Sequence, residues 1–420
     1  MIYKCPNCNG ALEYNPATDE MECAHCGSGF TMQEVEAVNQ KKEEHTYNQQ
    51  TGRQDVLLDG ESVKKASAEA DNDASEAEID IFADRETMDC NIYTCTSCGA
   101  ELFINDNEAA TFCAYCGQPT VVFSRVAKEL KPDSIVPFKI TKEQAVNGIR
   151  EHLNKKNFVP KEIKNFNVDK VRGIYVPYWV FDIYYYDWQS WEYTTGEGRD
   201  KRTISYDREA ECMLKGLTLD ASKILNDELS QRLEPYDVRT RKPFEPGYLS
   251  GFYADKYDLE EEKLRNYAYY RAKQFFDAEV LKTIPQQNAT IRWSHPKRVI
   301  KKAEYTLLPA WFITFRYNYE TYTMLVNGQT GKIVGTVPFD KKKVRSMFIT
   351  IAAIVSLFAT AFIYCFIDGV GAYFGALIFL FIPMGLFMVS RSDMRRLTKA
   401  MNLTREYETA EYVQERQDRD

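Results

Sequence analysis

The chain has 420 residues, of which 44% are hydrophobic and 27% are charged, so it can form two or three domains with hydrophobic cores. Its formal net charge is −8 at pH 7, an acidic balance that disfavours a general binder of nucleic acid or other polyanions. No apolar secretory segment begins the chain, so we expect no export of its N-terminal part.

Eight of the eleven cysteines form two clusters that share the spacing C-x2-C-x14-C-x2-C. Their members are Cys5, Cys8, Cys23 and Cys26 in the first cluster, and Cys95, Cys98, Cys113 and Cys116 in the second. A C-x2-C turn aims two thiolates at one centre, and two such turns complete a tetrahedron around a metal ion. Four thiolates leave no open position for a substrate, so we predict two structural Zn2+ sites, in zinc ribbons at residues 1–30 and 90–124.

Two alternatives to zinc remain open for these clusters. A single iron of the rubredoxin type takes the same four ligands, and disulfides could pair the cysteines, although a cytosolic location disfavours them. His25 is not expected to be a ligand, because Tyr115 occupies the matching place in the second cluster. Ribbons of about thirty residues bury too little surface to fold alone, so metal binding would supply their stability.

The charges of the two ribbons favour protein partners over nucleic acid. Residues 1–30 contain Lys4 as their only lysine or arginine, and residues 91–123 contain neither. A zinc ion with four thiolates adds a formal charge of about −2 to each ribbon. Because phosphate binding needs cations that displace counterions, nucleic acid is the less favoured partner.

Residues 31–89 differ in composition from the ribbons on either side. A short helix is expected at Thr31–Asn39, after which large apolar residues are few. Glu61–Asp89 contains ten acidic residues against three basic ones, which predicts an acidic disordered linker over 31–89. Ile79–Phe82 is the apolar segment that could instead fold on contact with a partner.

Residues 125–340 are predicted to form an aromatic-rich α+β domain, and all five tryptophans lie in it. Helices are expected at Thr141–Lys156, Asp220–Leu233 and Asp258–Ile284, strands at Val171–Tyr186 and Tyr305–Glu320, and a hairpin turn at Asn327–Gly331. Val176–Trp179 (VPYW) and Leu308–Trp311 (LPAW) echo each other, which suggests two related β-units that face each other. The aromatic side chains are expected to be core packing rather than the lining of a ligand groove.

No segment carries a pattern typical of an active site. The chain lacks a glycine-rich phosphate loop, a nucleophile elbow and a histidine-containing metal motif. Cys90, Cys212 and Cys365 are isolated, and a lone cysteine is more often a packing residue than a nucleophile. We therefore predict no catalytic and no cofactor-binding residues, and expect a non-enzymatic protein.

Two apolar segments near the C-terminus predict a membrane anchor. Met347–Ile367 and Val370–Val389 contain no charged residue and no histidine, and each is long enough as a helix to cross a hydrocarbon core of about 30 Å. Only Asp368 and Gly369 separate them, so a two-helix transmembrane hairpin is expected at residues 346–390. The alternative is a buried helical hairpin in the core of a domain.

The flanks of this hairpin indicate its orientation. Lysines and arginines precede the first segment and follow the second, so a multi-pass protein of the cell membrane with both termini in the cytoplasm is expected. Residues 391–420 would form a cytoplasmic juxtamembrane tail. Gly371 and Gly375 form a small-residue face that permits helix contacts within the hairpin or between copies in a homo-oligomer.

Several phrases of the sequence resemble one bacterial family. They are YKCPNCNGALEY and CAHCGSGF in the first ribbon, IVPFKITKEQA, GIYVPYWVFD and LSGFYADKYD, and LLPAWFITFRY followed by VNGQTGKIVG. These phrases resemble bacterial membrane-anchored proteins with a transcription factor IIB-type zinc ribbon. The resemblance implies a membrane adaptor in envelope-stress systems that contain phage-shock-protein-A-like and flotillin-like proteins, with the eight cysteines as zinc ligands and no catalytic residue.

Together these patterns predict an α+β fold with two zinc ribbons, a mixed α/β-strand domain and a C-terminal transmembrane hairpin. The expected function is a zinc-ribbon membrane adaptor that displays protein-binding ribbons at the cytoplasmic face. The alternative is a membrane-tethered zinc-ribbon protein associated with nucleic acid or RNA polymerase, for which salt-sensitive binding to DNA or RNA would be the sign.

Overall fold

The computed structural model describes residues 3–38, residues 85–103 without 97 and 98, residue 113, and most of the range 121–358. The gaps in that last range are 157, 167–170, 197–200, 223–224, 226, 258, 260, 318–319, 336, 338–339, 341–342, 345, 348–349, 352 and 356. Most of the predicted linker, the second apolar segment and the tail therefore lie outside the described residues.

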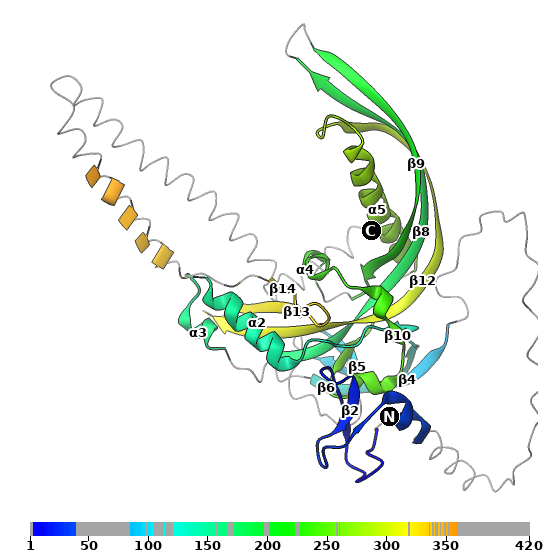
Figure 1. Cartoon of the computed structure of the whole chain (residues 1–420), viewed down its shortest axis with the longest axis vertical. Coiled ribbons are helices and arrows are strands. Elements are labelled where there is room, and N and C mark those ends of the chain that lie inside the picture. Colours follow the sequence, from blue (N-terminus) through cyan, green and yellow to red (C-terminus); the bar gives the residue numbers. More distant parts are fainter. Residues whose placement is uncertain are drawn as a thin grey trace, which may run out of the picture.

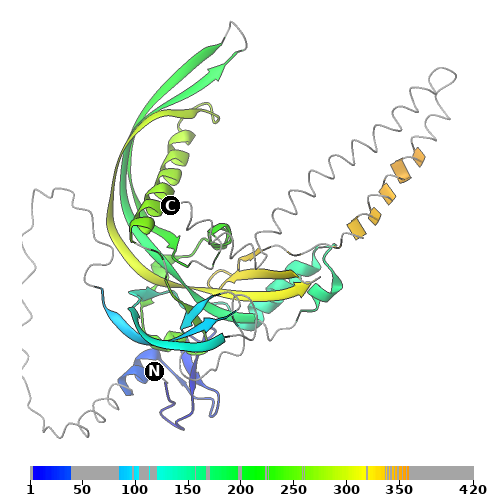
Figure 2. The ribbon, with the colours of Figure 1, turned by 180° about the vertical axis from the view of Figure 1, so that it is seen from behind.

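A strongly curved sheet of eleven strands forms the body of the molecule (Figure 1). Its three long strands are β8 (Val171–Thr195), β9 (Arg202–Asp220) and β12 (Thr290–Tyr317), with β8 in the middle. Helix α5 (Glu261–Lys282) lies in the concave side of the arc that these strands make, as both views show (Figures 1 and 2). The arc therefore has one covered face and one open face.

Shorter elements extend this sheet at its lower end. Its other strands are β4 (Thr87–Cys95), β5 (Glu101–Phe103), β6 (Val121–Leu130), β7 (Ser134–Ile135), β10 (Lys242–Pro243), β11 (Tyr253–Asp255), β13 (Glu320–Asn327) and β14 (Ile333–Gly335). The other helices are α2 (Lys142–Asn154), α3 (Lys161–Lys164), α4 (Asp227–Leu233) and the 3-10 turns η3 (Val238–Thr240) and η4 (Pro246–Leu249). A separate three-stranded sheet is formed by β1 (Leu12–Asn15), β2 (Glu20–Cys23) and β3 (Gly29–Phe30).

The two sequence echoes, predicted to lie in two related β-units that face each other, instead lie on hydrogen-bonded neighbouring strands of one sheet. β8 and β12 run antiparallel, and the register sets Leu307 opposite Pro177 and Leu308 opposite Val176. Proline cannot donate to a second neighbouring strand. Each proline lies at a point where one outer partner strand ends and the next begins. On β8, strand β11 pairs with the residues before Pro177, and β9 pairs with the residues after it. The prolines are thus tolerated inside long strands.

Burial alternates along β8, and α5 packs against the buried residues on the inner face. Tyr185, Asp187 and Gln189 are each at most 1% exposed, and Tyr185 packs on Phe276 of α5 with ring centroids 4.7 Å apart. The amide Nε2 of Gln189 donates to Asp187 at 2.8 Å and to Asp277 of α5 at 2.6 Å. Successive residues of a strand face opposite sides, so the same strand leaves its other face open.

A buried ion pair fixes the middle of α5 to the end of β9. The guanidinium of Arg271 pairs with Glu234 and donates to the carbonyl oxygen of Thr218 on β9 at 2.5 Å. The hydroxyl of Thr218 donates to the same carboxylate at 2.8 Å. The side chains of Arg271 and Glu234 are only 12% and 14% exposed, so loss of one leaves the other charge buried.

The predicted helices are confirmed in part. α2 begins with the capping box of Thr141 and Gln144, and α5 lies within the predicted range. The helix predicted to begin at Asp220 is wrong in its start, because Asp220 is the last residue of β9 and pairs with Tyr178. Pairing with a long neighbouring strand outweighs a local capping signal.

The predicted fold class needs correction, because the described chain is mainly β-sheet rather than α+β. Of the helices α2 to α5, only α2 and α5 are longer than two turns. β8 and β12 continue well past the predicted strands, and the strands β4, β5 and β6 of the second ribbon region join the same sheet. The sequence pattern identified the strand cores but not their extensions, which have polar residues on the open face.

The prediction of a transmembrane hairpin, with its multi-pass location and cytoplasmic termini, is also corrected. Among the described residues, none of the helices combines the length and the apolar character that crossing a membrane requires. A span needs about 20 consecutive apolar residues in one helix. The helical residues described after the last strand lie between 343 and 358, and the remainder of 346–390 lies outside the described residues.

Replacement of Arg271 by methionine tests the ion pair that holds α5. Arg271→Met is expected to lower the free energy of unfolding by roughly 3 kcal/mol, because Glu234 then stays buried without its partner. Lys282→Met is the control, since Lys282 and Glu279 form an ion pair whose side chains are 66% and 71% exposed. Chemical denaturation should show a change below about 0.5 kcal/mol for this control.

Candidate metal centre

Two tight turns bring the first four cysteines together. The amide of Asn9 donates to the carbonyl of Cys5 at 2.8 Å, and the amide of Cys5 donates to Gly10 at 2.7 Å. The second turn repeats this pattern, with Gly27 donating to Cys23 at 2.8 Å and Cys23 to Ser28 at 3.0 Å. Asn9 and Gly27 both have a positive φ, which Asn and Gly adopt most readily. These two turns form the tip of the ribbon.

The four sulfur atoms are spaced as one metal ion requires. Those of Cys5 and Cys26 are 3.6 Å apart, and those of Cys8 and Cys23 are 3.4 Å apart. All four lie within 4.8 Å of one another. Sulfurs placed tetrahedrally at about 2.3 Å from an ion would be separated by about 3.8 Å. The first cluster could therefore bind a metal ion through four thiolates, and His25 does not belong to the group.

The thiols affect each other's ionisation. Hydrogen bonding with the side chain and backbone of Ser28 lowers the pKa of Cys26 to about 6. A backbone hydrogen bond at Gly10 lowers the pKa of Cys8, but hydrogen bonds with Cys23 and Cys26 outweigh it and raise this pKa to about 12. Crowded thiols cannot all ionise without a compensating cation, so metal binding here would release protons.

The other end of this ribbon is fixed to the body. Tyr14 of β1 is buried, its ring lies 5.2 Å from that of Tyr248 and 6.4 Å from that of Phe252, and its amide donates to Ser250 at 3.2 Å. Its hydroxyl donates to Asp19 at 2.7 Å. Burial, together with this hydrogen bond, raises the pKa of Tyr14 well above its ordinary value, so the phenol stays protonated and remains a donor.

Exposure separates the two ends of the ribbon. Residues 6–9 and 24–27 of the tip are all exposed, and they include the ligands Cys8 and Cys26. Cys5 and Cys23 are at most 2% exposed and belong to the same core cluster as Tyr14 and Phe252. The cluster of cysteines thus connects a buried base to an exposed tip.

The second cysteine cluster is described only in part. The amide of Gly99 donates to Cys95 at 2.9 Å and that of Cys95 to Ala100 at 2.8 Å, which repeats the turns of the first cluster. Cys95 and Cys113 are both buried and belong to one core cluster. Cys98 and Cys116 lie outside the described residues, so one group of four cysteines is evident rather than the predicted two. None of the described cysteines forms a disulfide, which disfavours the disulfide alternative for them.

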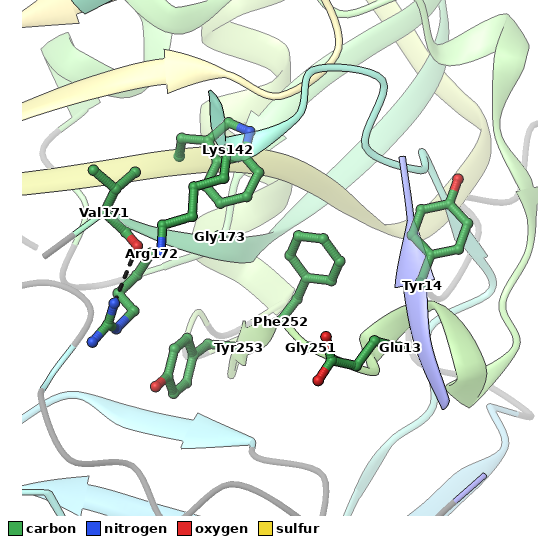
Figure 3. Close-up of a pocket in the computed structure, with 10 residues that line it drawn as sticks. Glu13, Tyr14, Lys142, Val171, Arg172, Gly173, Gly251, Phe252 and Tyr253 are labelled. Carbon is green, nitrogen blue, oxygen red and sulfur yellow. Dashed lines mark hydrogen bonds between the residues drawn. The ribbon is translucent and has the colours of Figure 1, made fainter. Parts of the chain in front are cut away.

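A pocket of about 440 Å³ lies at the junction between the ribbon and the body (Figure 3). Glu13 of β1 faces it from the ribbon, and Lys142 and Arg172 face it from the body. Phe252 lines the pocket. Position 173 must be glycine, because a Cβ there would lie 2.5 Å from a ring carbon of Phe252. A pocket with cations on one side and a carboxylate on the other could hold a small polar group. No sequence motif predicts this pocket, because its lining comes from five separate segments.

Comparison with known proteins gives one relative with substantial coverage. The chain is 27% identical over 365 residues to the uncharacterized protein YdjG of Bacillus subtilis (strain 168), a match that covers 83% of this chain and 94% of that protein. No protein-family model matches the chain, and neither does any solved structure. That relative is uncharacterized, so the similarity assigns no activity, ligand or partner to this chain.

The metal ligands can be tested at an exposed position. Cys26→Ala is expected to lower the bound metal by about one ion per chain, because three thiolates cannot close the shell. His25→Ala is the matched control, since His25 is exposed in the same turn but is not part of the group. Elemental analysis of purified protein measures both variants, and equal metal content in both would contradict the assignment.

The attachment of the ribbon to the body can be tested through Tyr14. Tyr14→Ala removes the ring contacts with Tyr248 and Phe252 and is expected to weaken docking of the ribbon by roughly 3 kcal/mol. Hydrogen exchange should then become faster in residues 3–38 but remain slow in β8. Tyr270→Ala on α5 is the control, because that side chain is 63% exposed. Equal loss of protection in β8 would show general unfolding instead.

Proposed function

We propose that this chain is a non-enzymatic adaptor whose N-terminal ribbon holds a structural zinc ion and presents a protein-binding tip. The supporting observation is the arrangement of the first cysteine cluster, with two buried ligands and two ligands at an exposed tip. A closed shell of four thiolates leaves no position for a reacting water. The metal would therefore fix the shape of the tip rather than perform chemistry.

Zinc is the metal that suits this cluster best. Four thiolates in two tight turns are the usual ligand set of structural zinc, and zinc undergoes no redox change that would alter the tip. Cys5, Cys8, Cys23 and Cys26 would be the ligands. When bound, the ion would neutralise charge among crowded sulfurs and hold the two turns together.

The charge of the ribbon favours a protein partner. Its described residues 3–38 contain Lys4 as their only lysine or arginine, against acidic residues in β1, β2 and the helical segment 32–38. Phosphate contacts would lack cations on this surface. The sequence resemblance described above suggests phage-shock-protein-A-like or flotillin-like proteins as the partner class.

We also propose a second zinc ion in the cluster of Cys95, Cys98, Cys113 and Cys116. The turn from Cys95 to Ala100 has the same backbone hydrogen bonds as the turn from Cys5 to Gly10, and Gly99 has a positive φ of 75°. Buried Cys113 lies in the same core cluster as Cys95, which supports a common centre. This ion would stabilise β4 and β5 at the end of the large sheet.

Counting metal ions distinguishes one site from two. The native chain is expected to hold about two zinc ions, Cys26→Ala and Cys113→Ala about one each, and the combined variant almost none. Cys90→Ala is the control, because Cys90 is in no disulfide and lies outside both clusters. A native chain that holds a single zinc ion would contradict the second site.

Partner binding by the tip can be tested without touching a ligand. Ala24→Arg places a bulky charge between Cys23 and His25 at the exposed tip and is expected to weaken binding of a purified phage-shock-protein-A-like or flotillin-like protein on the order of tenfold. Ala17→Arg is the matched control, since Ala17 is exposed in the β1–β2 turn at the other end of the ribbon. Unchanged zinc content would show that the ribbon is intact, and equal binding by both variants would contradict the proposal.

A further inference from the structure

Two open strand edges bound the upper part of the curved sheet. Beyond the register shifts that follow Phe181 in β8 and Ile300 in β12, the sheet consists of three strands, and residues 183–195, 202–214 and 290–300 are called the arm (Figure 1). Along the arm, β9 and β12 pair with β8 and with no other described strand. Such edges expose rows of backbone donors and acceptors that another strand can pair.

The two edges differ in charge. On the open face of the arm, β9 presents the exposed acidic residues Asp207, Glu209 and Glu211. Arg208 on β9 points to the covered face, where its guanidinium donates to Thr283 at 3.0 Å. The β12 edge and its continuation to residue 302 contain no acidic residue, and the exposed basic residues there are Arg292, Lys297, Arg298, Lys301 and Lys302.

The register of the arm sets these opposite charges at the same level. Tyr186 of β8 lies opposite Glu211 of β9 on one side and opposite Lys297 of β12 on the other. Directly opposite residues of neighbouring strands face the same side of a sheet. Within one copy, Glu211 and Lys297 are therefore two strand spacings apart, about 9.6 Å. Across an edge-to-edge contact at the same level, one spacing of about 4.8 Å would separate their strands.

Apolar side chains beside these charges are exposed as well. Met213 of β9, on the same face as Glu211, is 44% exposed, and Trp188 of β8 is 48% exposed. Trp188 packs against Trp293 of β12 with ring centroids 4.9 Å apart. A strand added along β9 would cover Met213, which favours association.

We propose that a second copy of this chain docks its β12 edge along the β9 edge of the first, so that their sheets continue into one another. β9 and β12 both run antiparallel to β8, so the two edges would pair as parallel strands. The contact joins different edges, and further copies can therefore add to form a ring or an open array.

A two-fold contact between two β9 edges is disfavoured, because it would bring the acidic rows of both copies together. Pro296 removes one backbone donor from the β12 edge. Backbone hydrogen bonds along this edge are therefore incomplete, and charged and apolar side chains also help to set the register between the two copies. This inference does not depend on the metal centre or on the proposed adaptor function.

Charge reversal in the purified full-length chain tests the contact by sedimentation velocity over a range of concentrations. Glu211→Lys and Lys297→Glu each place like charges across the contact and are expected to weaken self-association on the order of tenfold. The combined variant restores an opposite pair and should associate nearly as the native chain does. Glu279→Lys on α5 is the control, because this exposed side chain is not on either edge and its replacement should leave self-association unchanged.

A zero-length carboxyl–amine cross-linker, applied to a mixture of isotope-labelled and unlabelled copies, then identifies the residues in contact. Links between Glu211 of one copy and Lys297 of another are expected. A chain that remains monomeric, a combined variant as weak as the single ones, or links confined within one copy would each overturn the proposal. Binding of a labelled oligonucleotide by a monomeric chain, abolished by Lys297→Glu, would assign the basic edge to nucleic acid and would overturn it too.

Discussion

β8 and β12 pair antiparallel over 22 residue pairs, and four further strands of the large sheet pair directly with one of these two. β9 and β11 pair with β8, while β7 and β13 pair with β12. α5 packs on the inner face because alternate residues of β8 are large and apolar or bonded to the helix. A long two-stranded ladder alone would be marginal in water, so burial of this face under α5 stabilises the arc.

A continuous set of aromatic contacts connects the ribbon to this ladder. Tyr14 of the ribbon packs on Phe252, Phe252 stacks on Phe138 with centroids 4.3 Å apart, and Phe138 contacts Tyr175 of β8 at 5.0 Å. The ribbon is thus part of the folded body rather than a module on a free tether. A metal ion that orders the tip would therefore hold it on a rigid support, as the proposed adaptor surface requires.

The metal centre could be predicted from the sequence because its geometry depends on residues that are close together in the chain. A C-x2-C turn fixes its two sulfurs within a few residues. The spacing alone therefore predicted correctly that Cys5, Cys8, Cys23 and Cys26 form one group. The pocket beside Phe252 could not be found in this way, because β1, α2 and β8 meet there only through tertiary packing. The second ribbon region showed the same limit, since β5 pairs with β11 about 150 residues later in the chain, a contact that no local pattern reports.

By itself, the sequence determined the cysteine turns, the capped helix α2, the helix α5 and the V-P-Y-W and L-P-A-W strand cores, because each depends on neighbouring residues or on a short repeat. Only the tertiary structure decided that β8, β9 and β12 extend into a curved arm, and that Asp220 ends a strand instead of starting a helix. It also corrected the α+β expectation and the transmembrane hairpin. The physical reason is that strand length and sheet membership depend on hydrogen bonds to distant segments, whereas hydropathy and capping report only local preference.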